Sequence, residues 1–304
     1  MSFVVFTDGC SNLPGYILSR YQIHTVPFTY TINGEKIVYN GDIESFDAPA
    51  HYNLLRAGEL IQTSLANTQQ FIDHFRPVLE AGQDVIYIGM SSGISGTYQA
   101  SSIAAAELME EFPDRRVRTV DSLGAGFGPG LLTILAAEAR DEGKTVDEAA
   151  DYLDEKKMDL CEFFTVDDLM FLRRTGRLST TGALAGTMLG IKPILRGDEA
   201  GHIVTCQKCR GRKKAVDTLA QLYETRVVDA QNQIIAISHG DCQEEAQALA
   251  DKILAIAQPK ELIFCPHEPV TGSHVGPGML ALFFFGKGRL ISKTLFQLGT
   301  GFFH

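Results

Sequence analysis

A cluster of small and hydroxylated residues lies between a predicted buried strand (84–89) and a predicted helix. The cluster has the sequence GMSSGISGTY and covers residues 89–98. A helix N-terminus points backbone N–H groups and the positive end of the helix dipole toward one place, which favours an anion. The loop has neither the lysine of a triphosphate-binding loop nor the glycine pattern of a dinucleotide site. We therefore expect a smaller anion here, such as a carboxylate or a single phosphate.

The same loop also fits G-x-S-x-G, the pattern of a nucleophile elbow between a strand and a helix. The nucleophile of such an enzyme would be Ser91. Asp241, followed by His267 or His274, would complete a triad in hydrolase order. No His-Gly-Gly segment for an oxyanion hole precedes the serine. A serine hydrolase is therefore the alternative to a binding site, and simple capping of the helix by the hydroxyl groups is a third interpretation.

Strands and helices alternate on both sides of this loop, which predicts an α/β fold with a mostly parallel sheet and flanking helices. Residues 3–7, 84–89 and 116–120 are the predicted strands. Ligands of such sheets bind beyond the carboxyl ends of the strands. Asp8, the serine loop and Asp121 all fall at such ends, so we expect them near one another.

A change of pattern after residue 159 divides the chain into two predicted α/β domains. We place the N-terminal domain at residues 1–159 and the C-terminal domain at residues 160–286. The serine loop then faces a cleft between the two domains. Residues 287–304 form a C-terminal extension of unknown role, and we expect its removal to leave ligand binding intact.

Composition argues against several classes of function. Of 304 residues, 45% are hydrophobic and 21% are charged, as in ordinary globular proteins. The formal net charge of −10 argues against nucleic-acid binding, which needs a basic surface. No stretch reaches the roughly 20 apolar residues of a membrane span, and residues 1–20 lack the pattern of a secretory signal. We expect a cytoplasmic protein without a transmembrane segment.

Six dispersed cysteines indicate reduced thiols rather than a disulfide scaffold. Cys206 and Cys209 have the spacing of a zinc or redox pair, but no second pair accompanies them and no helix begins at the first cysteine. Asp8 and Asp121 lack an Asp/His cluster at ligand spacing, so we interpret them as turn residues. The sequence therefore predicts neither a metal site nor a cofactor.

Seven motifs, in order over residues 1–286, together resemble the DegV family of fatty-acid-binding proteins. The motifs are TD at 7–8, TS at 63–64, SSGISGTYQ at 91–99, VDS at 120–122, TGRLS at 175–179, GIKPI at 190–194 and HVGPG at 274–278. The resemblance implies two α/β domains, with an acyl chain in a tunnel and its carboxylate near the cleft between the domains. By the same resemblance, the carboxylate contacts fall on Thr63 and Ser95, with Arg177 and His274 close by. Further candidates in these motifs are Ser64, Ser92 and Gly96.

The family resemblance also implies a function. It implies a cytoplasmic carrier that buries a long-chain fatty acid and presents its carboxyl group to a separate fatty acid kinase, which forms an acyl phosphate for phospholipid synthesis. Such a subunit has no catalytic base and no cofactor, and any contact with a membrane is transient. A basic run at 208–214 is either a solvated face or a docking patch for the kinase. In the second case we expect Arg210 and Arg212 to be the docking residues.

Overall fold

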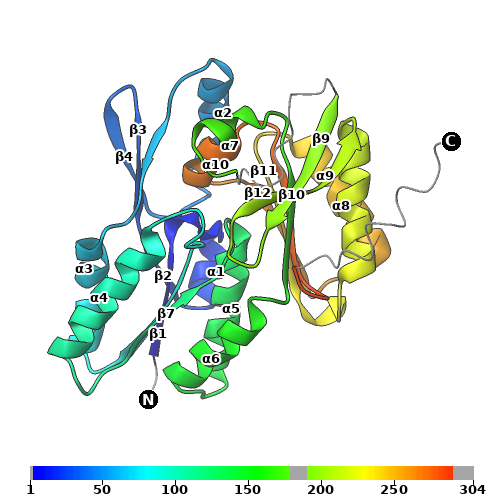
Figure 1. Ribbon diagram of the computed structural model, residues 1–304. Coiled ribbons are helices and arrows are strands. Elements are labelled where there is room, and N and C mark those ends of the chain that lie inside the picture. The colour runs from blue at the N-terminus through cyan, green and yellow to red at the C-terminus, as the bar shows by residue number, and fades with distance from the viewer. Residues whose placement is uncertain (1–2, 179–189, 290–304) are drawn as a thin grey trace.

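The computed structural model describes residues 3–178 and 190–289, arranged in two halves that meet along a common interface (Figure 1). A helix predicted at 180–189 lies outside the described residues. The N-terminal half is built on a four-stranded parallel sheet with the strand order β2-β1-β6-β7. Its strands are β1 (Phe3–Asp8), β2 (Ile23–Val26), β6 (Asp84–Gly89) and β7 (Val117–Asp121). The predicted parallel sheet is therefore confirmed.

Helices cover both faces of this parallel sheet (Figure 1). One face packs against α3 (Thr68–Glu80) and α4 (Thr97–Glu111), and the other against α1 (Gly15–Arg20), α5 (Phe127–Asp141) and α6 (Val146–Lys156). Both α3 and α6 begin with a capping box, as their sequences predict, because Asn67 and Thr145 accept a hydrogen bond from the third residue of the following helix.

A separate antiparallel sheet of three strands projects from the N-terminal half, in the order β4-β3-β5. Its strands are β3 (Phe28–Ile32), β4 (Glu35–Tyr39) and β5 (Gln62–Ser64). The turn at Asn33 and Gly34 has φ values of 52° and 82°, as the predicted type I′ hairpin requires. The polar sequence of residues 62–64 is typical of a loop. They form a strand instead, and pairing of Thr63 with Tyr30 fixes the threonine in place.

The C-terminal half is built on a six-stranded mixed sheet, in the order β10-β9-β8-β13-β11-β12. Its strands are β8 (Leu160–Thr165), β9 (Ile191–Gly197), β10 (Ile203–Arg210), β11 (Ile234–His239), β12 (Glu261–Pro266) and β13 (Leu280–Phe285). One face of the sheet is covered by α8 (Arg212–Arg226) and α9 (Gln243–Ile256). The other face is directed toward the N-terminal half.

Helix α5 packs between the two large sheets, in contact with both β1 and β11. Most residues of α5 are apolar or small, and most of them are buried, which is typical of a helix inside a core. At its start, the ring of Phe127 lies 5.8 Å from the ring of Phe283 on β13, in an edge-on arrangement. One hydrophobic core thus runs through both halves. The division into domains at 159/160 falls between α6 and β8 and stays a prediction.

The shorter helices lie in the connections. They are α2 (Ala48–Arg56), α7 (Met170–Arg174), α10 (Pro269–Val275) and two 3₁₀ turns, Gly9–Ser11 and Ala230–Asn232. Helix α10 contacts both α2 and the small sheet. No helix in the described part of the chain has the length and apolar character needed to cross a membrane.

The first residues of the predicted extension 287–304 contact the rest of the fold, and the expected effect of removing the extension stays a prediction. Their backbone N–H groups donate to carbonyls at the end of α8 and before β8. The side chain of Arg289 is buried, with 2% exposed. Its guanidinium donates to the backbone carbonyls of Ser122, Leu123 and Lys157, and so connects the segment to the loop after β7.

Candidate functional site

A cavity of about 450 Å³ lies between the two halves of the molecule. This volume is within the range of small-molecule binding sites. Its walls come from the small sheet, the serine loop, the loop after β7, the inner face of the C-terminal sheet and α10. Much of the wall is apolar, including Phe28, Met90, Phe164, Ile203, Met279 and Phe283.

All the ligand-binding residues that we predicted lie on the wall of this one cavity, although they come from four separate segments. They are Thr63, Ser64, Ser92, Ser95, Gly96, Arg177 and His274. Of this set, Ser64, Ser92, Gly96 and Arg177 are exposed, so they mark the end of the cavity that is open to solvent. The structure brings the residues together, and their role in binding stays a prediction.

The hydroxyl group of Thr63 lies 2.8 Å from Nε2 of His274. We expected this histidine on a loop, but it lies in the last turn of α10, whose packing against β5 holds the two side chains together. Burial lowers the pKa of the His274 imidazole to about 4, and the positive charges of Arg177 and Arg174 add to this effect. The imidazole is therefore neutral at pH 7. Its Nδ1 is buried and has no hydrogen-bond partner among the described residues.

The hydroxyl group of Ser95 lies just before α4. Its oxygen accepts a hydrogen bond from the Thr97 N–H at 3.3 Å, and the two hydroxyl groups are 2.9 Å apart. The N–H of Gly96, which lies between Ser95 and Thr97, makes no hydrogen bond within the described residues. Ser95 and Gly96 therefore offer donors at the solvent-exposed end of the cavity.

Two aspartates, at the ends of the two strands that flank β6, hold the serine loop. The Met90 N–H donates to the Asp8 carboxylate at 3.1 Å, and the Ser92 N–H donates to the Asp121 carboxylate at 3.2 Å. Both aspartates are thus turn residues, as their sequence context predicts. The expectation that the loop N–H groups face an anion is wrong for these two groups, because carboxylates of the protein already accept from them.

Ser91 does not have the contacts of a nucleophile. Its side chain is fully buried, and its hydroxyl group donates to the backbone carbonyl of Gly201 at 3.0 Å. His267 instead contacts the hydroxyl group of Ser238 at 2.9 Å, and the other candidate histidine contacts the β5 threonine. Asp241 forms an ion pair with an arginine of α2. These contacts argue against the serine hydrolase alternative.

Sequence reasoning missed Glu162, which also lines the cavity. It pairs with Phe283 across strands β8 and β13, on the face of the sheet directed at the N-terminal half. Only 8% of the residue is exposed, and its Oε1 has no hydrogen-bond partner among the described residues. Burial raises the pKa of this carboxyl to about 7, with the charge of Arg289 and the Ala125 N–H opposing the rise. Glu162 is the only acidic residue in the mostly apolar segment 160–166. This is the sequence feature that could have indicated its importance.

The contacts of the C-x-x-C pair argue against a metal or redox site. Cys206 and Cys209 are both buried on β10, where their thiols contact the Ile194 carbonyl and the Thr218 hydroxyl group. Burial raises the pKa of the Cys206 thiol to about 12, so it is not ionised at neutral pH. Over residues 3–178 and 190–289, no group of three or more His, Cys, Asp or Glu side chains is arranged to hold a metal ion.

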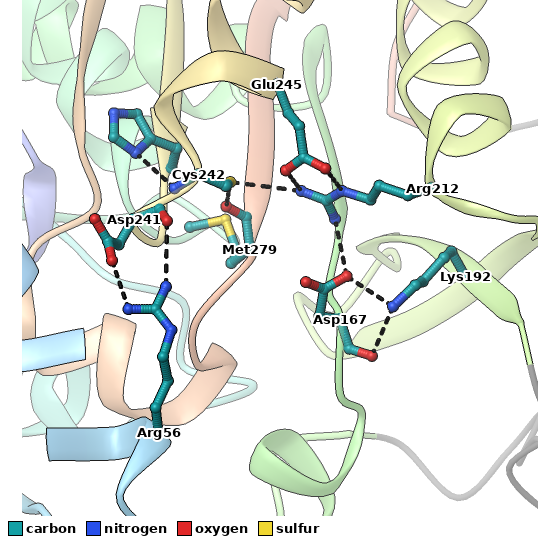
Figure 2. Close-up of polar contacts among 9 residues, drawn as sticks. Arg56, Asp167, Lys192, Arg212, Asp241, Cys242, Glu245 and Met279 are labelled. Carbon is teal, nitrogen blue, oxygen red and sulfur yellow. Dashed lines mark hydrogen bonds and ion pairs between the residues drawn. The ribbon is translucent and has the colours of Figure 1, made fainter. Parts of the chain in front are cut away.

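The two predicted docking arginines lie in different surroundings. The guanidinium of Arg212 is 3.1 Å from the Glu245 carboxylate and 3.8 Å from that of Asp167, and its side chain is only 15% exposed (Figure 2). Lys192 adds a second cation 2.7 Å from Asp167. The charge of Arg212 is therefore matched inside the fold. Arg210, at the end of β10, is exposed.

Comparisons with known proteins agree with this architecture. A family model described as "Uncharacterised protein, DegV family" matches residues 2–287. A DegV domain-containing protein from Clostridium perfringens is 38% identical over 287 residues, which cover 94% of this chain and 98% of that protein.

Two solved structures also align over most of both chains. DegV from Bacillus subtilis, described as a fatty acid binding protein, has 29% identity and a TM-score of 0.80, covering 94% of this chain and 100% of that one. A DegV family protein from Thermus thermophilus, solved in a study of its fatty acid binding, has 27% identity and a TM-score of 0.84 with the same coverage. The chain described here belongs to the DegV family.

Proposed function

We propose that this protein binds one long-chain fatty acid in the cavity, with the carboxylate at Thr63 and Ser95 and the acyl chain along the apolar wall. The observation that carries the proposal is the Thr63–His274 contact of 2.8 Å at the solvent-exposed end of a cavity whose wall is largely apolar. The reported fatty acid binding of the two related proteins supports the same ligand class.

The carboxylate must find hydrogen-bond donors, because an ionised group taken out of water is costly unless it is paired. A neutral His274 that donates from Nε2 to the Thr63 oxygen leaves the threonine proton free for the ligand. Ser95 accepts from the Thr97 N–H, and when it also accepts from the Thr97 hydroxyl group its own proton is free for the ligand. Two hydroxyl donors and the Gly96 N–H can then meet the two carboxylate oxygens.

The acyl chain supplies most of the affinity. Burial of each CH₂ group contributes about 0.8 kcal/mol, so a sixteen-carbon chain offers on the order of 10 kcal/mol before the costs of ordering. The polar groups at the exposed end then fix the orientation of the ligand. This division between an apolar wall and a few polar groups is typical of small-molecule sites.

We further propose that the protein is a cytoplasmic carrier without catalytic activity of its own, which presents the carboxyl group to a separate kinase. Ser64, Ser92 and Gly96 are exposed beside the proposed carboxylate position, so the active site of a partner can reach it. Phosphorylation of the carboxylate by that kinase would give an acyl phosphate.

Arg210 is the residue that we retain for docking of this kinase, since the charge of Arg212 is already matched. Exposed neighbours of the same sign are Lys208, Lys213 and Lys214. In a chain with a net charge of −10, such a patch would attract an acidic partner surface and raise the association rate. We expect Arg210→Ala to slow phosphorylation of the bound acid at low salt while leaving fatty acid affinity unchanged.

The decisive experiment for ligand binding starts from protein purified from cells and extracted with organic solvent. We expect mass spectrometry of the extract to show a long-chain fatty acid at about one molecule per chain, and the delipidated protein to bind added palmitate. An extract without fatty acid, together with no binding of added palmitate, would overturn the proposal.

A further inference from the structure

The buried end of the cavity contains a carboxyl group that a plain acyl chain cannot satisfy. Strand β8 directs Leu160, Glu162 and Phe164 toward the N-terminal half, and the strand paired with it, β13, presents Ala281 and Phe283 on the same side. Glu162 is the one acidic residue among these five positions. It lines the cavity and is 92% buried, since 8% of it is exposed.

The surroundings of Glu162 provide room for its carboxyl group but few donors. A Cβ atom on Gly124 or on Gly128 would lie 2.0 Å or 1.6 Å from Oε1, so glycine at both positions leaves the space that the carboxyl group occupies. The guanidinium of Arg289 donates to three backbone carbonyls, and it acts on Glu162 only through its charge, which opposes the rise in the pKa of the carboxyl. Oε1 has no hydrogen-bond partner in the part of the chain that the structure describes.

A second buried glutamate shows how this protein satisfies such a group when its role is structural. Glu268 precedes α10 and is fully buried. Its two carboxylate oxygens accept hydrogen bonds from the Val270 N–H at 2.6 Å and the Thr271 N–H at 2.8 Å, so it caps the helix. Glu162 has a single backbone donor, the Ala125 N–H, which leaves Oε1 without a partner among the described residues, and unlike Glu268 it lines the ligand cavity.

We infer that Glu162 is a second polar contact point in the cavity and accepts a hydrogen bond from a hydroxyl group carried partway along the acyl chain. The ligand class is therefore a hydroxylated long-chain fatty acid. This inference rests on the proposed fatty acid binding and adds a specificity to it.

The physical reason is the cost of an unsatisfied buried acceptor. A plain acyl chain that fills the cavity excludes water from Glu162 and carries no hydrogen-bond donor to replace it. A hydroxyl group at the matching position donates to the carboxyl oxygen and replaces the hydrogen bond that water would otherwise provide. A hydroxyl group elsewhere on the chain meets the apolar wall and loses its own water without compensation.

The test measures the affinity of delipidated protein for palmitic acid and for its monohydroxylated isomers, one position at a time. We expect one interior position, or two adjacent ones, to bind about 10-fold more tightly than palmitic acid, and the other isomers to bind less tightly. In Glu162→Leu this preference should disappear. In Glu162→Gln, which keeps an acceptor oxygen, part of it should remain.

Phe164→Leu is the matched control, because it alters the same wall two residues away without touching a polar group. It should change the affinities for plain and hydroxylated chains by the same factor. A wild-type protein that binds palmitic acid but favours no hydroxylated isomer would overturn the inference, even if Glu162→Leu fails to fold. A wild-type protein that binds none of the acids would instead overturn the proposed function.

Discussion

The two ends of the cavity differ in whether their polar side chains have hydrogen-bond partners. At the exposed end, the Thr63 hydroxyl group contacts His274 and the Ser95 hydroxyl group contacts that of Thr97. When His274 and Thr97 are the donors, Thr63 and Ser95 keep their protons for a ligand. At the buried end, Oε1 of Glu162 has no partner among the described residues. If the proposed function holds, the exposed end supplies hydrogen-bond donors to an anion, whereas satisfaction of the Glu162 carboxyl depends on the group that fills the buried end.

The largest expected effect is a loss of unfolding free energy when the contacts of Arg289, which lies near Glu162, are removed. Arg289→Met leaves the carbonyls of Ser122, Leu123 and Lys157 without a donor and removes the positive charge near Glu162. Three backbone carbonyl oxygens then lose a charged donor, which together costs about 3–5 kcal/mol of unfolding free energy. Urea unfolding followed by circular dichroism measures this loss.

Lys287→Met is the control for this prediction, because Lys287 is exposed in the same segment. It should change the unfolding free energy by less than about 0.5 kcal/mol. If both variants unfold at the urea concentration of the wild type, Arg289 does not support the cavity.

The second effect concerns the exposed end. Thr63→Ala combined with Ser95→Ala removes both hydroxyl donors and should weaken fatty acid binding by about 2–4 kcal/mol, which is roughly 30- to 1,000-fold. Displacement of a fluorescent fatty acid measures the affinity. Ser102→Ala, whose hydroxyl group contacts the Tyr98 carbonyl away from the cavity wall, should bind like the wild type. Unchanged affinity in the double variant would reject the carboxylate site.

The third effect is a difference in the pH dependence of the unfolding free energy between the wild type and Glu162→Gln. The pKa of Glu162 is raised from 4.5 to about 7, so the folded protein holds this proton more tightly than the unfolded chain does. The stability from this group is present below pH 4.5 and is lost as the pH rises to 7. Glu162→Gln does not lose this stability as the pH rises, because glutamine has no carboxyl group to ionise.

The unfolding free energy of Glu162→Gln relative to the wild type should therefore rise by about 2–3 kcal/mol between pH 4.5 and pH 7.5. Urea titrations at these two pH values measure it. A difference that stays constant with pH would mean that the Glu162 carboxyl keeps its ordinary pKa in the folded protein.

The same contrast explains what the sequence could predict. The residues at the exposed end lie in loops and strand ends with recognisable motifs, such as the serine loop and the segment around His274, and the structure brings them to one cavity. Even there, the sequence did not show that β5 is a strand or that Asp121 accepts from the Ser92 N–H, because both depend on pairing between distant segments.

The buried end could not be predicted in this way. Glu162 stands inside a short apolar strand, and its importance depends on which face of that strand meets the N-terminal half. Arg289 lies beyond the last predicted strand, in a segment that we expected to be removable after Gly286. Its partners are backbone carbonyls more than 130 residues away, and no local pattern indicates such contacts.

The orientation of the ligand is the central claim, and ¹³C NMR of protein loaded with palmitate labelled at its carboxyl carbon tests it most directly. We predict one carboxyl resonance, separate from that of free palmitate, which Thr63→Ala and Ser95→Ala each shift and Glu162→Gln leaves in place. A resonance that Glu162→Gln shifts and the two hydroxyl variants leave unchanged would contradict it, because the carboxylate would then lie at the buried end.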